Sequence, residues 1–176
     1  YCHTSTFRET LRMRSPNLVM KELYKLDEIY GIYAIRFIDD NFLMNKKFLQ
    51  EITPLLKKFG KPYRVYCRAQ DLDEKSVKLL ADSGCIMVGC GVESGSQKMH
   101  DLMETKKSVK KMIKGIQLAK KANLSVRVGL IVGFPGETWD TVKESLLNLK
   151  KMPFDSYNLF NFVPLPGTDP YNNPQK

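Results

Sequence analysis

Four short motifs carry side chains that could bind a cofactor, and each is polar or rich in glycine. A cysteine thiolate can bind iron, a carboxylate accepts hydrogen bonds from ammonium and hydroxyl groups, and a glycine lets a ligand approach the backbone. Such motifs at the carboxyl ends of strands are typical of binding loops in α/β folds. The four are Tyr1-Cys2, Asp39-Asp40-Asn41, Gly91-Val92-Glu93-Ser94-Gly95-Ser96, and Gly129-Leu130-Ile131-Val132-Gly133 followed by Phe-Pro-Gly-Glu-Thr.

Strand-like runs alternate with amphipathic helical segments, and these elements must position the motifs. Apolar residues recur at the three- and four-residue spacing of a helix face in five segments. These segments begin near Asn17, Asn45, Glu74, Lys107 and Trp139. The strand-like runs are 34–39, 63–68, 86–93, 125–132 and 157–163. This alternation predicts a parallel sheet with helical crossovers, either an open doubly wound sheet or a TIM-type barrel.

The two faces of the predicted strands differ. In 63–68, Arg64, Tyr66 and Arg68 alternate with apolar residues, and in 125–132 Arg127 and Gly129 do the same. A doubly wound sheet carries helices on both faces and is usually apolar on both. One apolar and one polar face instead predict a curved, incompletely closed barrel with helices on its outer face only.

Composition narrows the class of protein. The chain has 176 residues, of which 43% are hydrophobic and 27% charged, as in a soluble globular domain. It contains no apolar run long enough to span a membrane, and we expect no membrane partner. The four cysteines lack disulfide spacing, which favours a reducing, cytoplasmic location. The net charge of +9 favours anionic partners or reflects a solvated lysine-rich surface.

In this order, the four motifs resemble the radical S-adenosylmethionine (SAM) superfamily. The resemblance is closest to its branch of cobalamin-dependent and magnesium-protoporphyrin cyclase-like Fe-S oxidoreductases, and it covers residues 1–168. It implies an α/β fold, a partial (β/α)6 TIM-like open barrel, with residues 1–176 forming one radical SAM core domain. It also implies an enzyme that cleaves SAM reductively at a [4Fe-4S] cluster. The resulting 5′-deoxyadenosyl radical would abstract a substrate hydrogen.

The cluster of this family is bound by three cysteines spaced Cys-x3-Cys-x2-Cys. Cys2 resembles the third of them, and Tyr1 the aromatic residue before it. The first strand and two cysteines would then lie upstream of residue 1, so we expect this stretch alone to bind no cluster and to be inactive. Cys67 and Cys90 are expected to be core thiols that face the helices, and Cys85 to precede its strand.

The resemblance also assigns SAM contacts to the second and third motifs. Asp39, Asp40 and Asn41 would accept the methionine amino group; the alternative is an Asp pair that caps the helix near Asn45. Glu93 and Ser94 would bind the ribose hydroxyls, and the alternative for Glu93 is a surface ion pair. Gly95 would give the backbone room to turn.

The remaining SAM contacts would come from the last strands. Arg127, or in competition Arg68, would bind the methionine carboxylate; the alternative is an arginine–carboxylate pair that fills the barrel. Gly129, Ile131 and Gly133 would let the adenine lie against the backbone, and Val163 would contact it from the last strand. Glu137 fits a structural role at a helix start equally well.

The expected partners are a small-molecule substrate and an external electron donor. Cobalamin, if used, would be bound by a domain upstream. An RNA-modifying, methylthiotransferase-like enzyme is the first alternative; the basic charge favours it, and Asp-Asp-Asn and Glu93 count against it. A non-catalytic anion-binding barrel is the second. The motifs identify neither a catalytic residue nor a substrate.

Overall fold

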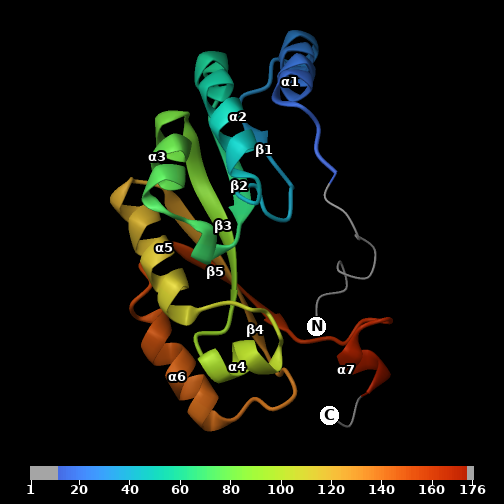
Figure 1. Cartoon of the computed structure of the whole chain (residues 1–176), viewed down its shortest axis with the longest axis vertical. Coiled ribbons are helices and arrows are strands. Elements are labelled where there is room, and N and C mark those ends of the chain that lie inside the picture. The colour runs from blue at the N-terminus through green and yellow to red at the C-terminus, as the bar shows by residue number, and fades with distance from the viewer. Residues whose placement is uncertain (1–11, 174–176) are drawn as a thin grey trace.

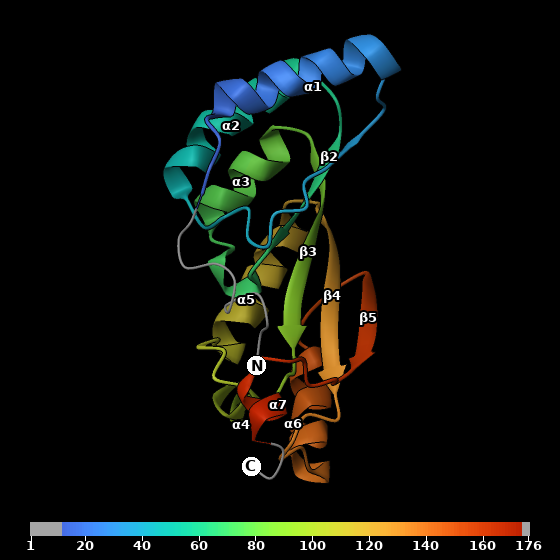
Figure 2. The ribbon, with the colours of Figure 1, turned by 90° about the vertical axis from the view of Figure 1, so that its right-hand side faces the viewer.

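Five parallel strands form one sheet whose order follows the sequence, β1-β2-β3-β4-β5. The computed structural model describes residues 12–173. The sheet curls into a half-barrel, which confirms the predicted partial TIM-like fold (Figure 2). The strands are β1 Ile35–Arg36, β2 Tyr63–Cys67, β3 Cys85–Glu93, β4 Ser125–Val132 and β5 Ser156–Asn161.

The crossover helices cover one side of this sheet. Helices α2, α3, α5 and α6 lie together on that side, and α1 packs against α2 (Figure 1). The four-residue α7, after the last strand, lies on the opposite side. The prediction of helices on the outer face only is therefore correct for the crossover helices and wrong for α7. The helices are α1 Pro16–Tyr30, α2 Lys46–Phe59, α3 Glu74–Asp82, α4 Gln97–Leu102, α5 Val109–Lys121, α6 Trp139–Leu149 and α7 Asp169–Asn172, with a 3-10 turn η2 at Ala69–Asp71.

Side-chain caps explain why the helices begin where they do. The residue before each of α1, α2, α3, α5 and α6 accepts a hydrogen bond from a backbone N–H of the first turn, which would otherwise lack a partner. For α6, Thr138 and Thr141 form a reciprocal capping box. The capping residues are Ser15, Asn45, Asp73, Ser108 and Thr138.

The main core lies between the outer face of the sheet and these helices. Val65, Val88 and Val128 point into it from three neighbouring strands, and each is at most 1% exposed. They meet Leu80 of α3 and Ile116 of α5, which are fully buried. The alternation read from the sequence therefore identifies the core face correctly, and it leaves the polar and glycine-rich face on the inside of the curve.

The structure departs from the predicted elements in three places. Strand β1 covers two residues instead of 34–39, because the chain leaves the sheet after Phe37 and rejoins it where Phe42 N–H donates to Tyr66 O. Cys85 is the first residue of β3, so the expectation that it precedes its strand is wrong. Helices α4 and α7 were not predicted. Within residues 12–173, no helix is both long and apolar enough to cross a membrane.

Candidate functional site

Glu93 ends β3 in a left-handed backbone conformation, with a φ of 61°. Residues other than glycine rarely adopt this conformation, and it recurs at functional sites. The pairing of β3 with β4 shifts register between Gly91 and Glu93. A Cβ added to Gly91 would lie 2.5 Å from Glu93 Oε1. Gly91 therefore leaves the space into which the Glu93 carboxylate folds back.

Lys107, from the loop before α5, binds this carboxylate. Its Nζ lies 2.8 Å from Glu93 Oε1 and donates to Gly91 O at 2.7 Å. The two side chains are only 10% (Lys107) and 14% (Glu93) exposed, so the pair is not the surface ion pair considered from the sequence. Glu93 Oε2 has no hydrogen bond or ion pair with any residue in the described part of the chain. One carboxylate oxygen is thus fixed, and the other is left to accept a ligand hydroxyl.

The loop around Lys107 is itself held by side chains. The Gln97 side chain donates to Lys107 O at 2.9 Å and accepts from Val109 N at 3.1 Å. Thr105 Oγ1 accepts from Lys107 N at 3.3 Å. Thr105 also contacts the buried His100, whose other ring nitrogen lies 2.8 Å from Ser94 O. Burial lowers the pKa of the His100 imidazole. The ammonium of Lys107 is therefore positioned by a network that the sequence did not reveal.

The segment after Glu93 is fastened to α6. Ser94 Oγ lies 2.8 Å from Ser145 Oγ, and Ser96 Oγ donates to Glu144 Oε2 at 2.5 Å. A Cβ added to Gly95 would lie 2.4 Å from Ser145 O, so this glycine permits close contact with α6 rather than an unusual turn. The Ser94 hydroxyl is buried in these contacts, and its predicted bond to the ribose stays a prediction.

A tight turn follows β4 and leaves open space above it. Gly133 has a φ of 78°, and its N–H donates to Glu137 Oε2 at 2.7 Å, which gives Glu137 a structural role. Phe134 is buried against Phe162, with ring centroids 4.6 Å apart, and Ile131 packs against this cluster. A Cβ on Gly133 would meet nothing within 4 Å. Open backbone at Gly133 is the kind of surface that a flat ring can contact.

Two other predicted contacts lie elsewhere on the inner face. Arg127 is the third residue of β4, well before its carboxyl end, and its Nε donates to Ser156 Oγ at 3.2 Å. Arg68 is exposed immediately after β2. Neither arginine forms an ion pair with a carboxylate in the described part of the chain, so a pair that fills the barrel is not observed there. Gly129 faces Phe160 of β5: a Cβ added to Gly129 would lie 3.8 Å from the Phe160 ring.

The Asp39-Asp40-Asn41 loop lies beyond β1. Asp39 and Asp40 are exposed, and Asn41 Nδ2 donates to Asp71 Oδ2 at 2.8 Å, which joins the loops after β1 and β2. The alternative in which this pair caps the next helix is wrong, because Asn45 caps it. Val163, just after β5, is 65% exposed. Tyr1 and Cys2 lie outside the described residues.

The described cysteines do not form a metal site. Cys67, Cys85 and Cys90 are buried, and Cys67 Sγ lies 3.7 Å from Cys90 Sγ in the core. Burial raises the pKa of the Cys85 thiol to about 12. Residues 12–173 contain no group of three or more His, Cys, Asp or Glu side chains that could hold a metal ion. The prediction of core thiols is confirmed.

A comparison with protein families decides the identity of the domain. The family model described as the radical SAM superfamily matches residues 1–149. The chain belongs to this superfamily. Relatives of this chain include proteins named as methyltransferases, a methylthiotransferase and a cyclase.

Two relatives show how far the sequence likeness extends. A protein named as an uncharacterized methyltransferase of Pyrococcus horikoshii is 31% identical over 171 residues, which is 96% of this chain and 37% of that protein. The anaerobic magnesium-protoporphyrin IX monomethyl ester cyclase of Rubrivivax gelatinosus is 25% identical over 173 residues, or 96% of this chain and 31% of that protein. The chain thus spans about a third of the length of these curated relatives.

A solved structure shows the same fold. The radical SAM methyltransferase TsrM from Kitasatospora setae, with cobalamin and a [4Fe-4S] cluster bound, superposes with a TM-score of 0.76. It is 18% identical, and the match covers 87% of this chain and 30% of TsrM. At this identity the likeness concerns the fold alone.

Radical SAM proteins use a [4Fe-4S] cluster and SAM, and the residues described here fit these two groups differently. Glu93 Oε2 and the open backbone at Gly133 suit the hydroxyls and the flat ring of a nucleoside. The three described cysteines are buried in the core and do not suit a cluster, which needs several thiolates held together. Cys2 is the one cysteine outside the described residues.

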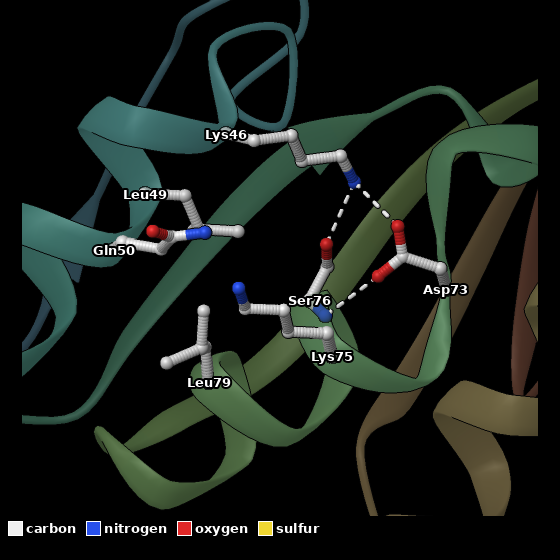
Figure 3. A pocket seen from close by; sticks show the side chains of 7 residues that line it. All are labelled: Lys46, Leu49, Gln50, Asp73, Lys75, Ser76 and Leu79. Carbon is white, nitrogen blue, oxygen red and sulfur yellow. Dashed lines mark hydrogen bonds and ion pairs between the residues drawn. The ribbon is translucent and has the colours of Figure 1, made fainter.

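A hollow of about 260 Å³ lies between α2 and α3, on the outer layer of this radical SAM domain (Figure 3). Lys46 Nζ donates to Asp71 O, Asp73 Oδ2 and Ser76 Oγ at 2.7–3.0 Å. An ammonium has three donors, and all are used here, so this lysine joins the two helices rather than binding a ligand. The predicted site residues do not line the hollow.

Proposed function

We propose that this chain is the core of a radical SAM enzyme that binds SAM at the carboxyl ends of β3 and β4. The observation that carries the proposal is Glu93, whose carboxylate is largely buried, fixed at one oxygen by Lys107 and unpartnered at the other among the described residues. A carboxylate held this way can accept a hydrogen bond from a ribose hydroxyl. Gly133 lies at the end of the neighbouring strand, where an adenine could approach the backbone.

The chain's own contribution would be binding, orientation and exclusion of water. Glu93 would fix the ribose, Gly133 and Ile131 would contact the adenine, and Asp39 or Asp40 would accept the methionine ammonium. A bound [4Fe-4S] cluster would supply one electron for reductive cleavage of SAM into methionine and a 5′-deoxyadenosyl radical, which would abstract a substrate hydrogen. A small-molecule substrate and an external electron donor complete the proposal. The name of the Pyrococcus horikoshii relative supports methyl transfer as the outcome.

Calorimetric titration with S-adenosylhomocysteine tests the binding site without requiring a cluster. We expect residues 1–176 to bind it, and Glu93→Gln to bind about tenfold more weakly, because a charged acceptor is lost. Glu28→Gln, an exposed change on α1, is the matched control and should bind as the wild type. If wild type and Glu93→Gln have equal affinities, Glu93 does not bind the ribose.

The radical step is tested on the natural protein in its full length. After reconstitution with iron and sulfide, addition of dithionite and SAM should produce 5′-deoxyadenosine, measured by mass spectrometry. A reconstituted protein that holds a cluster and binds SAM, yet forms no 5′-deoxyadenosine, would contradict the proposed chemistry.

A further inference from the structure

The strands of this domain carry arginine but no lysine. The five strands contain three arginines, Arg36, Arg64 and Arg127, and no lysine. The strand register places all three on the inner face. Arg36 of β1 is in register with Arg64 of β2. Tyr66, two residues after Arg64 and therefore on the same face, is in register with Gly89 of β3, which is in register with Arg127 of β4. The lysines lie in the helices and loops. A lysine-rich outer surface explains much of the net charge, but it does not explain guanidinium groups inside the curve.

The inner arginines have no acidic partner among the described residues. Some outer lysines do, as in the ion pairs Lys61–Asp27, Lys78–Asp82 and Lys120–Asp155. None of Arg36, Arg64 and Arg127 forms an ion pair within residues 12–173. Glu93 is the one acidic residue in the strands, and Lys107 occupies it. The inner face therefore carries positive charge that the described part of the domain does not compensate.

Tyr66 orients the first of these guanidinium groups. Arg36 Nη2 donates to Tyr66 Oη at 2.5 Å, and the guanidinium carbon lies 5.3 Å from the centre of the tyrosine ring. The ring lies over Gly89, where a Cβ would come within 2.6 Å of it. Gly89 thus makes room for Tyr66, and Tyr66 holds Arg36. A guanidinium has five N–H donors, so Arg36 keeps most of them for a ligand.

Arg64 lies directly beside Arg36 in the sheet. Neighbouring strands are about 4.8 Å apart, so two long side chains on the same face can reach one anion. The Arg64 side chain makes no hydrogen bond within the described residues. Paired planar guanidinium groups favour carboxylates and phosphates, which they bind through two parallel hydrogen bonds.

The pair is separate from the residue proposed to bind the ribose. Arg64 is in register with Met87, six residues before Glu93 on β3. At about 3.3 Å per residue this places the pair roughly 20 Å from Glu93 along the strand. An anion bound there would occupy the same inner face without competing for the ribose site.

We propose that Arg36 and Arg64, with Arg36 oriented by Tyr66, bind a carboxylate or phosphate group of the substrate on the inner face of the half-barrel. That the anion belongs to a substrate rests on the proposed function, whereas the anion site itself does not. The site predicts a substrate that carries its negative charge at a distance from the hydrogen that is abstracted.

The test is calorimetric titration of residues 1–176 at low chloride with inorganic phosphate and, separately, with succinate. We expect at least one anion to bind, and Arg36→Gln and Arg64→Gln each to weaken it about tenfold. Tyr66→Phe keeps the ring but removes the oriented oxygen, and should weaken binding less. Lys111→Gln, an exposed change on α5, is the control and should leave affinity unchanged. The anion that binds more tightly identifies the group as phosphate or carboxylate.

The same variants separate this proposal from the cofactor site. Arg36→Gln and Arg64→Gln should bind S-adenosylhomocysteine as the wild type does. If they weaken S-adenosylhomocysteine binding but not anion binding, the arginines belong to the cofactor site and the inference is wrong. It is also wrong if neither anion binds, or if Lys111→Gln weakens binding as much as the arginine variants. Anion binding without S-adenosylhomocysteine binding would support the anion site and contradict the proposed function.

Discussion

Replacing Lys107 by methionine would leave the Glu93 carboxylate buried without its cation. Lys107 and Glu93 are 10% and 14% exposed, and Lys107 Nζ lies 2.8 Å from Glu93 Oε1. Removing one partner of a buried pair costs about 3–5 kcal/mol, because the remaining charge is desolvated and uncompensated. Since both groups retain some exposure, we expect the lower end, a loss of roughly 3 kcal/mol in the free energy of unfolding. For a chain of this size that corresponds to a fall in Tm of roughly 6–12 °C.

Urea unfolding followed by far-ultraviolet circular dichroism measures this loss. Lys110→Met, an exposed change in the first turn of α5, is the control and should change stability by less than about 0.5 kcal/mol. The double variant Glu93→Gln/Lys107→Met removes both charges and should be more stable than Lys107→Met alone. A Lys107→Met protein as stable as the control, or a double variant whose loss equals the sum of the two single losses, would refute the reasoning.

Three further predictions concern packing and titration. Gly95→Ala should lower Tm through the clash with Ser145 O, at a cost of about 1–3 kcal/mol, whereas Gly129→Ala, with 3.8 Å to its nearest neighbour, should not; thermal melts of both variants check this. The pKa of Cys85 is raised by burial from 9.0 to about 12, so the thiol ionises first in the unfolded chain. Stability should therefore fall as pH rises above about 9, and iodoacetamide should label Cys85 at pH 9 only in urea; labelling of the native protein would contradict the burial. The lowered pKa of His100 means that the unfolded chain takes up its proton first, so stability should fall as pH drops through about 6.5. Urea unfolding at pH 7.5 and 5.5 measures the difference, and a His100→Asn variant that keeps the same dependence would refute the assignment.

The sequence predicted the features that depend on local periodicity. Strict alternation in 63–68 and 125–132 identified the inner face, because one side of each strand packs against helices and the other does not. The helix starts followed from the apolar repeats, and the starts expected near Asn45 and Trp139 lie within one residue of those observed. The glycines in residues 129–133 indicated backbone that a ligand could approach.

Features that depend on distant contacts were not readable. Lys107 stands in a lysine-rich segment that has the composition of a solvated surface, and only the fold brings its ammonium to Glu93. Helix α4 has six residues, too few for a clear apolar repeat. The backbone N–H of Gln97, the first residue of α4, donates to Glu144 of the distant helix α6. The loop after β1 is held by the Asn41 bond to Asp71, which lies thirty residues away in the sequence. The role of Gly95 depends on the backbone of α6, which local sequence does not show.

The loop of residues 94–96 is bound to α6, and this has a thermodynamic consequence for ligand binding. Helix α6 begins just after the Gly133 turn, and it holds the loop through Ser145, Glu144 and the Asn148 bond to Gly95 O. One helix, α6, therefore holds both the loop that follows β3 and the loop that follows β4. Because these contacts already fix both loops, a nucleoside that binds between them loses little affinity to ordering the protein. Changes on α6 that never touch a ligand should weaken its binding entropically, by letting the two loops move independently.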